Sequence, residues 1–195
     1  MMHQSMHVLL ATALAASTSA SVLHELVGAP PDSGAIDSLA KSLDAGHDIN
    51  EIGPHGGQTP LMQAVLTGND AAVKLLLARG ADTTIGEKDG YTPCHGAGFQ
   101  GRAAIMKALI AHGLPCTTDR HGDGFTPLHR ACWGHEARHT ETVRVLLKAG
   151  APVDQPTNTG QLPVDITKNE ATRKLLSFRM NKKKKAETEA AKGEL

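Results

Sequence analysis

The sequence predicts an all-α solenoid in which short helix pairs stack against one another. Three observations support this fold class: a motif returns about every 33 residues, apolar stretches between the copies end in glycine, and large rings are rare. The motif lies at 57–61, 90–94 and 124–128, with its prolines at 60, 93 and 127, and a degenerate copy follows at 160–164. With three Phe, one Trp and one Tyr in 195 residues, the core must consist of Leu, Ala and Val between closely spaced helices. Units of this kind cannot bury their apolar faces alone and are stabilised by stacking.

Each motif copy is predicted to start a helix pair. Thr59 and Thr126 precede proline, and a threonine N-cap followed by proline at the first helical position is a typical helix start. The apolar stretches 73–79, 105–112 and 143–149 form the second helices, which stop at the glycines 80, 113 and 150 because glycine adopts the left-handed conformation easily. Asp-Gly pairs at 89–90 and 123–124 predict tight turns between one pair and the next.

These linked motifs resemble the ankyrin repeat. The resemblance is carried by Thr126-Pro127-Leu128-His129-Arg130-Ala131 and by the helix ends 80–82 and 150–152, and it extends from Leu39 to about Leu176. It implies about three full repeats, near 54–86, 87–120 and 121–157, between divergent N- and C-terminal caps. It also implies that the rings of His95 and His129 hold the hairpins by hydrogen bonds. The extra residues 135–140 depart from the family pattern and predict a longer turn between the two helices of the repeat near 121–157.

The two ends of the chain differ from the repeats. Residues 1–20 are an apolar stretch followed by small residues, which predicts a signal peptide cleaved after Ala20; an Ala/Leu-rich N-terminal helix is the alternative. We expect the repeat domain at 21–180 and a charged flexible tail at 181–195. The final Lys192-Gly193-Glu194-Leu195 resembles the retrieval signal of the endoplasmic reticulum. The sequence thus predicts the secretory pathway, including the endoplasmic reticulum lumen, whereas the lysines 182–185 favour the nucleus or cytoplasm.

Composition and motif searches exclude several functions. The 20 basic and 20 acidic side chains balance, which argues against a general nucleic-acid binder. No apolar run is long enough for stable membrane insertion. Nucleophile, phosphate-loop and dinucleotide motifs are absent, so we expect no enzyme activity and no cofactor. We also expect the protein to be a monomer. The glycine-rich stretch 96–101 predicts a thinner or frayed helix.

A histidine and cysteine cluster provides the alternative function. His129, Cys132, His135 and His139 have a spacing compatible with a metal-binding or redox-active site. Cys132 and Cys94 replace core residues of the family pattern, which argues against a metal site because free cysteine commonly serves as a small buried apolar residue. Their positions differ by one helical turn, so we expect no disulfide.

Our main hypothesis is a non-enzymatic module that binds a protein partner on its hairpins and first helices. This assigns binding to side chains that the scaffold does not need: Gln58, Lys88, Asp89, Tyr91, Phe99, Asp123, Phe125, Arg130, Trp133 and Asn158. His55, Leu66, Thr67, Gln100 and Gln161 extend this set. For Tyr91 and Phe125, covering the next hairpin is an equal alternative. Large rings and arginine dominate interface energies, so replacing Trp133 and Arg130 by alanine is expected to abolish binding without affecting the fold.

Overall fold

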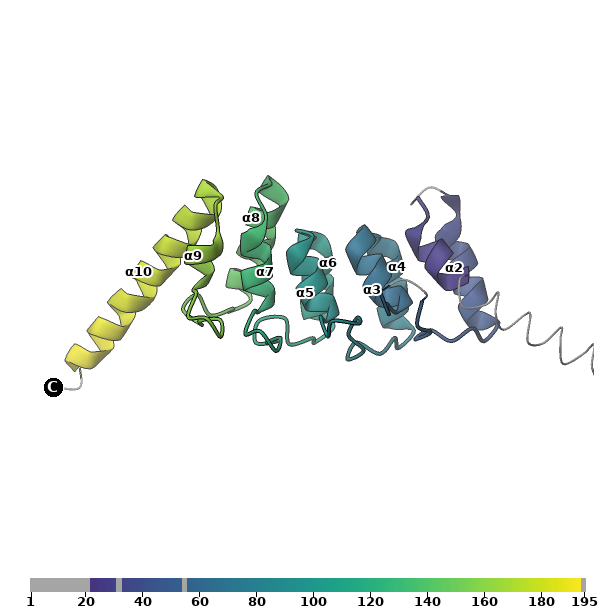
Figure 1. Ribbon diagram of the computed structural model, residues 1–195, viewed down its shortest axis with the longest axis horizontal. Helices are drawn as coiled ribbons and strands as arrows, with labels where there is room; N and C mark the ends of the chain where they lie inside the picture. Colours follow the sequence, from purple (N-terminus) through teal and green to yellow (C-terminus); the bar gives the residue numbers. More distant parts are fainter. Residues whose placement is uncertain (1–21, 31–32, 54–55, 194–195) are drawn as a thin grey trace, which may run out of the picture. The chain divides into compact units, whose positions relative to one another are not determined.

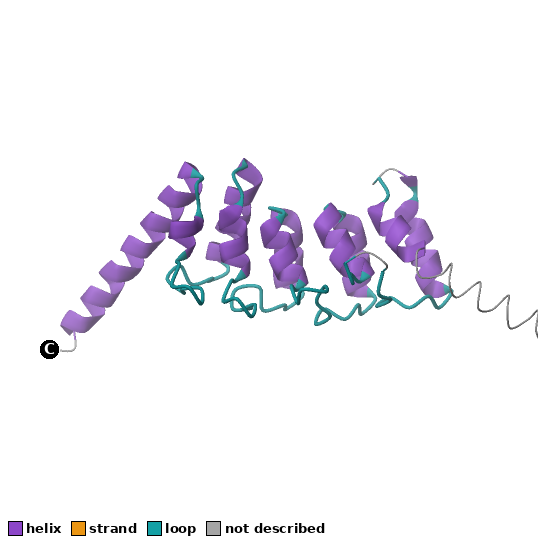
Figure 2. Ribbon diagram, viewed as in Figure 1, coloured by secondary structure: helices purple, strands orange, loops and turns teal. Residues whose placement is uncertain are grey.

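The protein is all-helical in the part of the chain that the structure covers. The computed structural model describes residues 22–30, 33–53 and 56–193, and these contain helices, turns and loops but no strand (Figure 2). Contacts divide the chain into two compact units, with the boundary between Thr92 and Pro93. Each unit consists of helices joined by tight turns, and these helices are short apart from α10 (Glu170–Gly193) at the end of the second unit (Figure 1).

The first unit contains the cap and the first full repeat. Residues 22–28 are helical, and α2 (Ala35–Asp44), α3 (Pro60–Thr67) and α4 (Asp70–Ala78) follow. Helix α4 packs against both α2 and α3. The core consists of aliphatic side chains, among them the fully buried Leu23, Leu39, Leu61 and Leu76. The His24 ring joins the cap to the first hairpin, because its Nε2 lies 2.9 Å from the Gln58 carbonyl oxygen.

The second unit contains the remaining helices. These are α5 (Pro93–Phe99), α6 (Ala103–Ala111), α7 (Pro127–Trp133), α8 (Ala137–Lys148), α9 (Pro163–Ile166) and α10 (Glu170–Gly193). First helices pack on first helices, α5 on α7 and α7 on α9, and second helices do the same, α6 on α8 and α8 on α10. The predicted stacking of helix pairs is therefore present within this unit.

The predicted helix ends are confirmed. The Thr59 and Thr126 hydroxyls accept hydrogen bonds from the backbone N–H groups of Met62 and His129, at 3.2 and 3.4 Å. The glycines 80, 113 and 150 have φ values of 80°, 97° and 96°. Local sequence chemistry thus sets where these helices begin and end.

The glycine-rich stretch forms the thinner helix of the two predicted alternatives. Residues 94–98 are buried and helical in α5, so this part of the stretch is not frayed. A Cβ atom at Gly98 would lie 2.5 Å from the Pro127 carbonyl oxygen. Gly98 is required because α5 and α7 approach each other too closely for a side chain at this position.

The inserted residues 135–140 of the third full repeat lengthen a helix and leave the turn short. Helix α7 ends at Trp133 and α8 begins at Ala137, which leaves three residues between them. Helix α8 has 12 residues, whereas α4 and α6 have nine. The insertion therefore forms an extra N-terminal turn of α8, in which the side chains of His139 and Thr140 are buried.

The residues expected to form a flexible tail are helical as far as Gly193. They continue α10 with exposed side chains at 181–192. Ala, Lys and Glu have high helix propensity, and Lys183–Glu187 and Lys185–Glu189 form ion pairs at i,i+4. Lys183 also pairs with Asp154. The segment is thus charged and helical, and its flexibility stays a prediction.

The predicted signal peptide lies outside the described residues. Among the residues that are described, none of the helices combines the length and apolar character needed to cross a membrane.

Candidate functional site

Five of the predicted binding residues meet in the second unit. The Arg130 guanidinium carbon lies 4.5 Å from the centre of the Phe125 ring and 4.6 Å from that of Trp133. Trp133 also makes an edge contact with Phe99, with 6.3 Å between ring centres. The Arg130 Nη2 donates a 2.7 Å hydrogen bond to the Asp123 Oδ2. We call Phe99, Phe125, Arg130 and Trp133, with Asp123, the aromatic–arginine surface.

Helix geometry explains why these side chains converge. Arg130 and Trp133 are three residues apart on α7 and therefore share one face. Phe125 directly precedes the Thr126 N-cap, and its ring contacts that of Trp133, with 5.1 Å between centres. Phe99 is the last residue of α5, which packs on α7. Two adjacent first helices and one hairpin thus supply all the rings.

The rings and the arginine differ in exposure. Phe99 and Trp133 are 51% and 44% exposed, which is unusual for large apolar side chains, whereas Arg130 is 6% exposed. Arg130 therefore lies beneath the rings and supports them. This changes the expectation for the combined exchange of Trp133 and Arg130: loss of Arg130 removes buried contacts and is expected to lower stability.

Asp123 connects the hairpin to the arginine. Its Oδ1 accepts a 2.9 Å hydrogen bond from the Phe125 backbone N–H and lies 2.9 Å from the His121 Nδ1. Burial by itself would raise the pKa of Asp123, but the hydrogen bonds from Phe125 and His121 and the charge of Arg130 keep it below its usual value. Asp123 therefore remains ionised and holds Arg130 in place.

Asn158 forms a polar edge beside this surface. Its side chain is exposed, donates to the Gly122 carbonyl at 2.8 Å and accepts from Arg120 at 3.1 Å. Its backbone N–H donates to the Asp123 carbonyl at 3.2 Å. Asn158 thus joins two successive hairpins, a structural role that leaves part of the side chain accessible.

The first unit contains the predicted binding residues Gln58, Lys88, Asp89 and Tyr91, together with Leu66 and Thr67, whereas Gln100 and Gln161 belong to the second unit. Lys88 and Asp89 are exposed at the hairpin tip, and Gln58 and Tyr91 are half-buried. The Lys88 backbone N–H donates to the Gly56 carbonyl at 3.0 Å, so two hairpins lie side by side. Burial raises the pKa of the neighbouring Glu87, against a hydrogen bond from Gln58 that lowers it. His55 lies outside the described residues.

The two histidines of the repeat motif hold the hairpins by hydrogen bonds, as the resemblance implies: His95 bonds to the next repeat, and His129 bonds to the N-cap of its own helix. The His95 Nε2 lies 3.2 Å from the Phe125 carbonyl oxygen. The His129 Nδ1 accepts from the Thr126 backbone N–H at 3.2 Å and lies 2.8 Å from its hydroxyl. Burial lowers the pKa of His129 to about 4, although the backbone of Gln161 and Gln155 favours the charged ring. The ring is therefore neutral at pH 7.

The histidine–cysteine cluster proposed as the alternative does not form. Cys132 is fully buried, and burial raises the pKa of its thiol to about 12, so it is a core residue. His139 is buried with its Nε2 3.1 Å from the Phe99 carbonyl oxygen, whereas His135 is exposed. Across the described residues no three His, Cys, Asp or Glu side chains gather in a way that would hold a metal ion.

A disulfide joins Cys94 to Cys116, which contradicts the expectation of three unpaired thiols. The two Cα atoms are 5.1 Å apart, within the range that a bridge needs. Cys94 is therefore bonded to Cys116 of its own repeat, and not to Cys132, the partner considered in the sequence. Counting from the repeat motif reveals the pair: Cys94 corresponds to Leu128 and Cys116 to Val153 in the next repeat, and both are buried there.

A surface depression in this unit offers no acid–base arrangement. It has a volume of about 430 Å³ and lies between α6 and α8. Its lining consists of basic and small apolar side chains with a single carboxylate, Glu141, which pairs with Arg144.

Comparison with known proteins agrees with the repeat architecture. A family model described as ankyrin repeats (3 copies) matches residues 14–119 and 61–158, which together span most of the chain. None of the curated proteins matches the chain. Repeats of this kind are generally modules for protein–protein interaction and are generally not enzymes. The chain therefore belongs to the ankyrin repeat family.

Proposed function

We propose that this protein is a non-enzymatic adaptor that binds a partner protein through the aromatic–arginine surface. The observation that supports the proposal most directly is the exposure of Phe99 and Trp133 at 51% and 44%, although both rings touch. Adjacent exposed rings are unfavourable in water and typically mark an interaction site. The scaffold itself does not need them, because its core is aliphatic.

The support beneath these rings favours tight binding. Arg130 contacts the faces of Phe125 and Trp133 and is fixed by Asp123. Rings that are already held in one orientation lose little conformational entropy when a partner binds. In addition, Arg130 and Asp123 neutralise each other, so the surface selects its partner mainly through apolar and aromatic side chains.

The exposed polar residues of the first unit extend the proposal. Lys88 and Asp89 lie at a hairpin tip, where ankyrin repeats commonly contact partners. We assign these residues and Gln58 and Tyr91 to polar contacts that add specificity. Such contacts at the rim of an interface contribute less energy than buried rings.

The test is affinity capture with the full chain and two matched variants. The combined exchange Phe99→Ala and Trp133→Ala should lower partner affinity by 2 kcal/mol or more, roughly 30-fold. Phe178→Ala is the control, since Phe178 is also exposed, at 66%, but lies on α10. Circular dichroism should confirm that all three proteins are equally folded. If the double variant captures the same proteins with unchanged affinity, the surface is not the binding site.

We further propose that the chain matures in the secretory pathway, including the endoplasmic reticulum lumen. The Cys94–Cys116 disulfide supports this, because such bonds form and persist in oxidising compartments. The remaining thiol, Cys132, is buried and so protected from wrong pairing. Sequencing the amino terminus of protein from its native cell provides the test: a start at Ser21 is expected, whereas an intact Met1 would place the protein in the cytoplasm or nucleus.

A further inference from the structure

Within the second unit, the disulfide joins the start of a helix pair to the segment that follows the end of that pair. Cys94 is in the first turn of α5, and Cys116 follows the Gly113 that ends the helix pair. Both cysteines are 1% exposed. The following repeat has two buried apolar side chains at the same places, Leu128 and Val153. A covalent bond here replaces a purely apolar anchor.

The hairpin segment that follows depends strongly on this bond. Between Ala111 and Asp123, Cys116 is the only residue whose side chain is buried. The others are exposed or half-buried and form turns. Few apolar contacts therefore hold this segment to α5, and such segments open at low free-energy cost.

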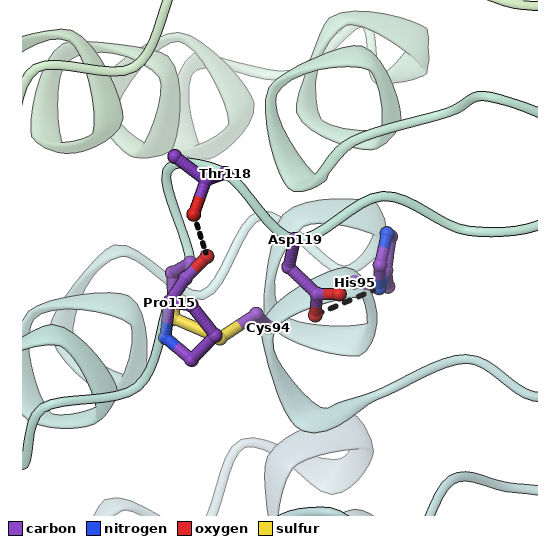
Figure 3. Close-up of a disulfide and its surroundings, with 6 residues drawn as sticks. Cys94, His95, Pro115, Thr118 and Asp119 are labelled. Carbon is purple, nitrogen blue, oxygen red and sulfur yellow. Dashed lines mark hydrogen bonds and ion pairs between the residues drawn. A yellow bond between two sulfur atoms is a disulfide. The ribbon is translucent and has the colours of Figure 1, made fainter.

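From Cys116 a continuous set of contacts leads to the aromatic–arginine surface. Three residues further on, the Asp119 Oδ2 lies 3.4 Å from the Nδ1 of His95, which is next to Cys94 (Figure 3). The His95 Nε2 lies 3.2 Å from the Phe125 carbonyl oxygen. Phe125 then packs on Arg130 and Trp133. The disulfide thus fixes Asp119 and His95 close together, and His95 holds the backbone of Phe125.

We propose that the Cys94–Cys116 disulfide regulates the aromatic–arginine surface, so that a low-molecular-weight thiol loosens this surface by reducing the bond. This inference rests on the proposed function and names its regulation. With the bond intact, Phe125 is held against Arg130 and Trp133. After reduction, the segment 114–119 moves away from α5, His95 loses Asp119, and the rings become mobile, although Asn158 still holds the following residues Arg120, Gly122 and Asp123.

The chemistry is ordinary thiol–disulfide exchange. The attacking thiolate forms a bond to one protein sulfur, and the other leaves as a thiolate and takes up a proton. A second thiol then resolves the mixed disulfide. Two protein thiols and one oxidised small-molecule disulfide result, with two electrons transferred to the protein. Because both sulfurs are buried, the hairpin segment must open before attack, and reduction is expected to be slow.

The only tryptophan of the chain is Trp133, so its fluorescence reports on this surface without a partner. The experiment compares acrylamide quenching of the full chain before and after dithiothreitol. We expect quenching to increase by up to about twofold, since 44% of the side chain is exposed already. Far-UV circular dichroism should remain unchanged, because the helices themselves do not require the bond.

Two variants complete the test. The combined exchange Cys94→Ala and Cys116→Ala should show the high quenching of the reduced protein with or without dithiothreitol. Cys132→Ala, which removes the unpaired thiol and keeps the bridge, should respond as the unmodified chain does. Equal quenching before and after reduction would refute the proposal. Simultaneous loss of the helical signal would refute it too, because the bond would then hold the whole unit together.

This readout is independent of the proposed binding function. If exchange of Phe99 and Trp133 leaves partner capture intact, the adaptor proposal fails even when the fluorescence responds to dithiothreitol. If capture is lost but fluorescence does not respond to dithiothreitol, only the regulation fails.

Discussion

Arg130 shows how a single side chain organises the candidate site. Its guanidinium lies against two rings and is ion-paired with Asp123. We expect Arg130→Ala to lower the free energy of unfolding by about 2 kcal/mol, since the cation–π contacts of a buried guanidinium and its ion pair with the partly exposed Asp123 are lost together. Arg130→Lys keeps the charge but not the planar stacking and should cost less. Urea denaturation followed by circular dichroism measures both, and an alanine variant as stable as the unmodified chain would contradict the supporting role.

His129 gives the fold a defined response to acid. Its pKa is lowered from the ordinary 6.5 to about 4 by burial, so between these values the unfolded chain binds a proton that the folded one does not. Stability is therefore lost as the pH falls through this window. From pH 7 to pH 5 we expect a loss of about 2 kcal/mol from this residue. Urea titrations at both pH values should show that the free energy of unfolding of His129→Gln falls less between pH 7 and pH 5 than that of the unmodified chain. An equal fall in both proteins would mean that other groups cause the pH dependence.

Individual residues were predictable to the extent that their roles are local. Phe99 and Trp133 are exposed as expected, because they are absent from the repeating apolar pattern. The burial of Arg130 was not foreseen, since it depends on rings that come from α5 and from the hairpin. The bridge at Cys116 was missed for a related reason: it depends on which two positions of one repeat meet in space.

At the scale of elements, the sequence predicts helix ends better than helix lengths. Threonine caps and terminal glycines act on adjacent backbone groups, so their effects are visible in the sequence. Whether inserted residues enter a helix depends on packing, as shown by His139, which is buried in the extra turn of α8. The helical continuation of α10 follows from helix propensity and i,i+4 charge pairs. The run of lysines at 182–185 favours a flexible tail in the sequence interpretation.

The close approach of α5 and α7 gives a prediction for this pair of elements. Gly98→Ala should destabilise the protein by about 1–3 kcal/mol, because the new methyl group would lie 2.5 Å from the Pro127 carbonyl oxygen and force the helices apart. Gly122→Ala is the matched control, as nothing lies within 4 Å of its added Cβ. Thermal unfolding should separate the two variants clearly. Equal midpoints would mean that α5 and α7 adjust without cost.

For the whole molecule, the fold class follows from the 33-residue period alone, whereas the covalent structure does not. A repeat pattern specifies which positions are buried, and it is indifferent to whether a buried pair is two aliphatic side chains or a disulfide. Three cysteines in 195 residues are too few for a disulfide-rich fold, so the composition does not indicate the single bridge that the structure contains. The state of the cysteines is therefore the property of the whole chain that most needs measurement.

Counting reactive thiols tests that state directly. Cys94 and Cys116 are bridged, and Cys132 is buried with its pKa raised to about 12, so the native protein should not react with iodoacetamide. After denaturation without a reductant, mass spectrometry should find one alkylated cysteine per chain, and after reduction all three. In the Cys132→Ala variant the denatured, non-reduced sample should contain none. Alkylation of three cysteines in the denatured, non-reduced protein would mean that the bridge does not form, and the proposals on compartment and regulation would fall with it.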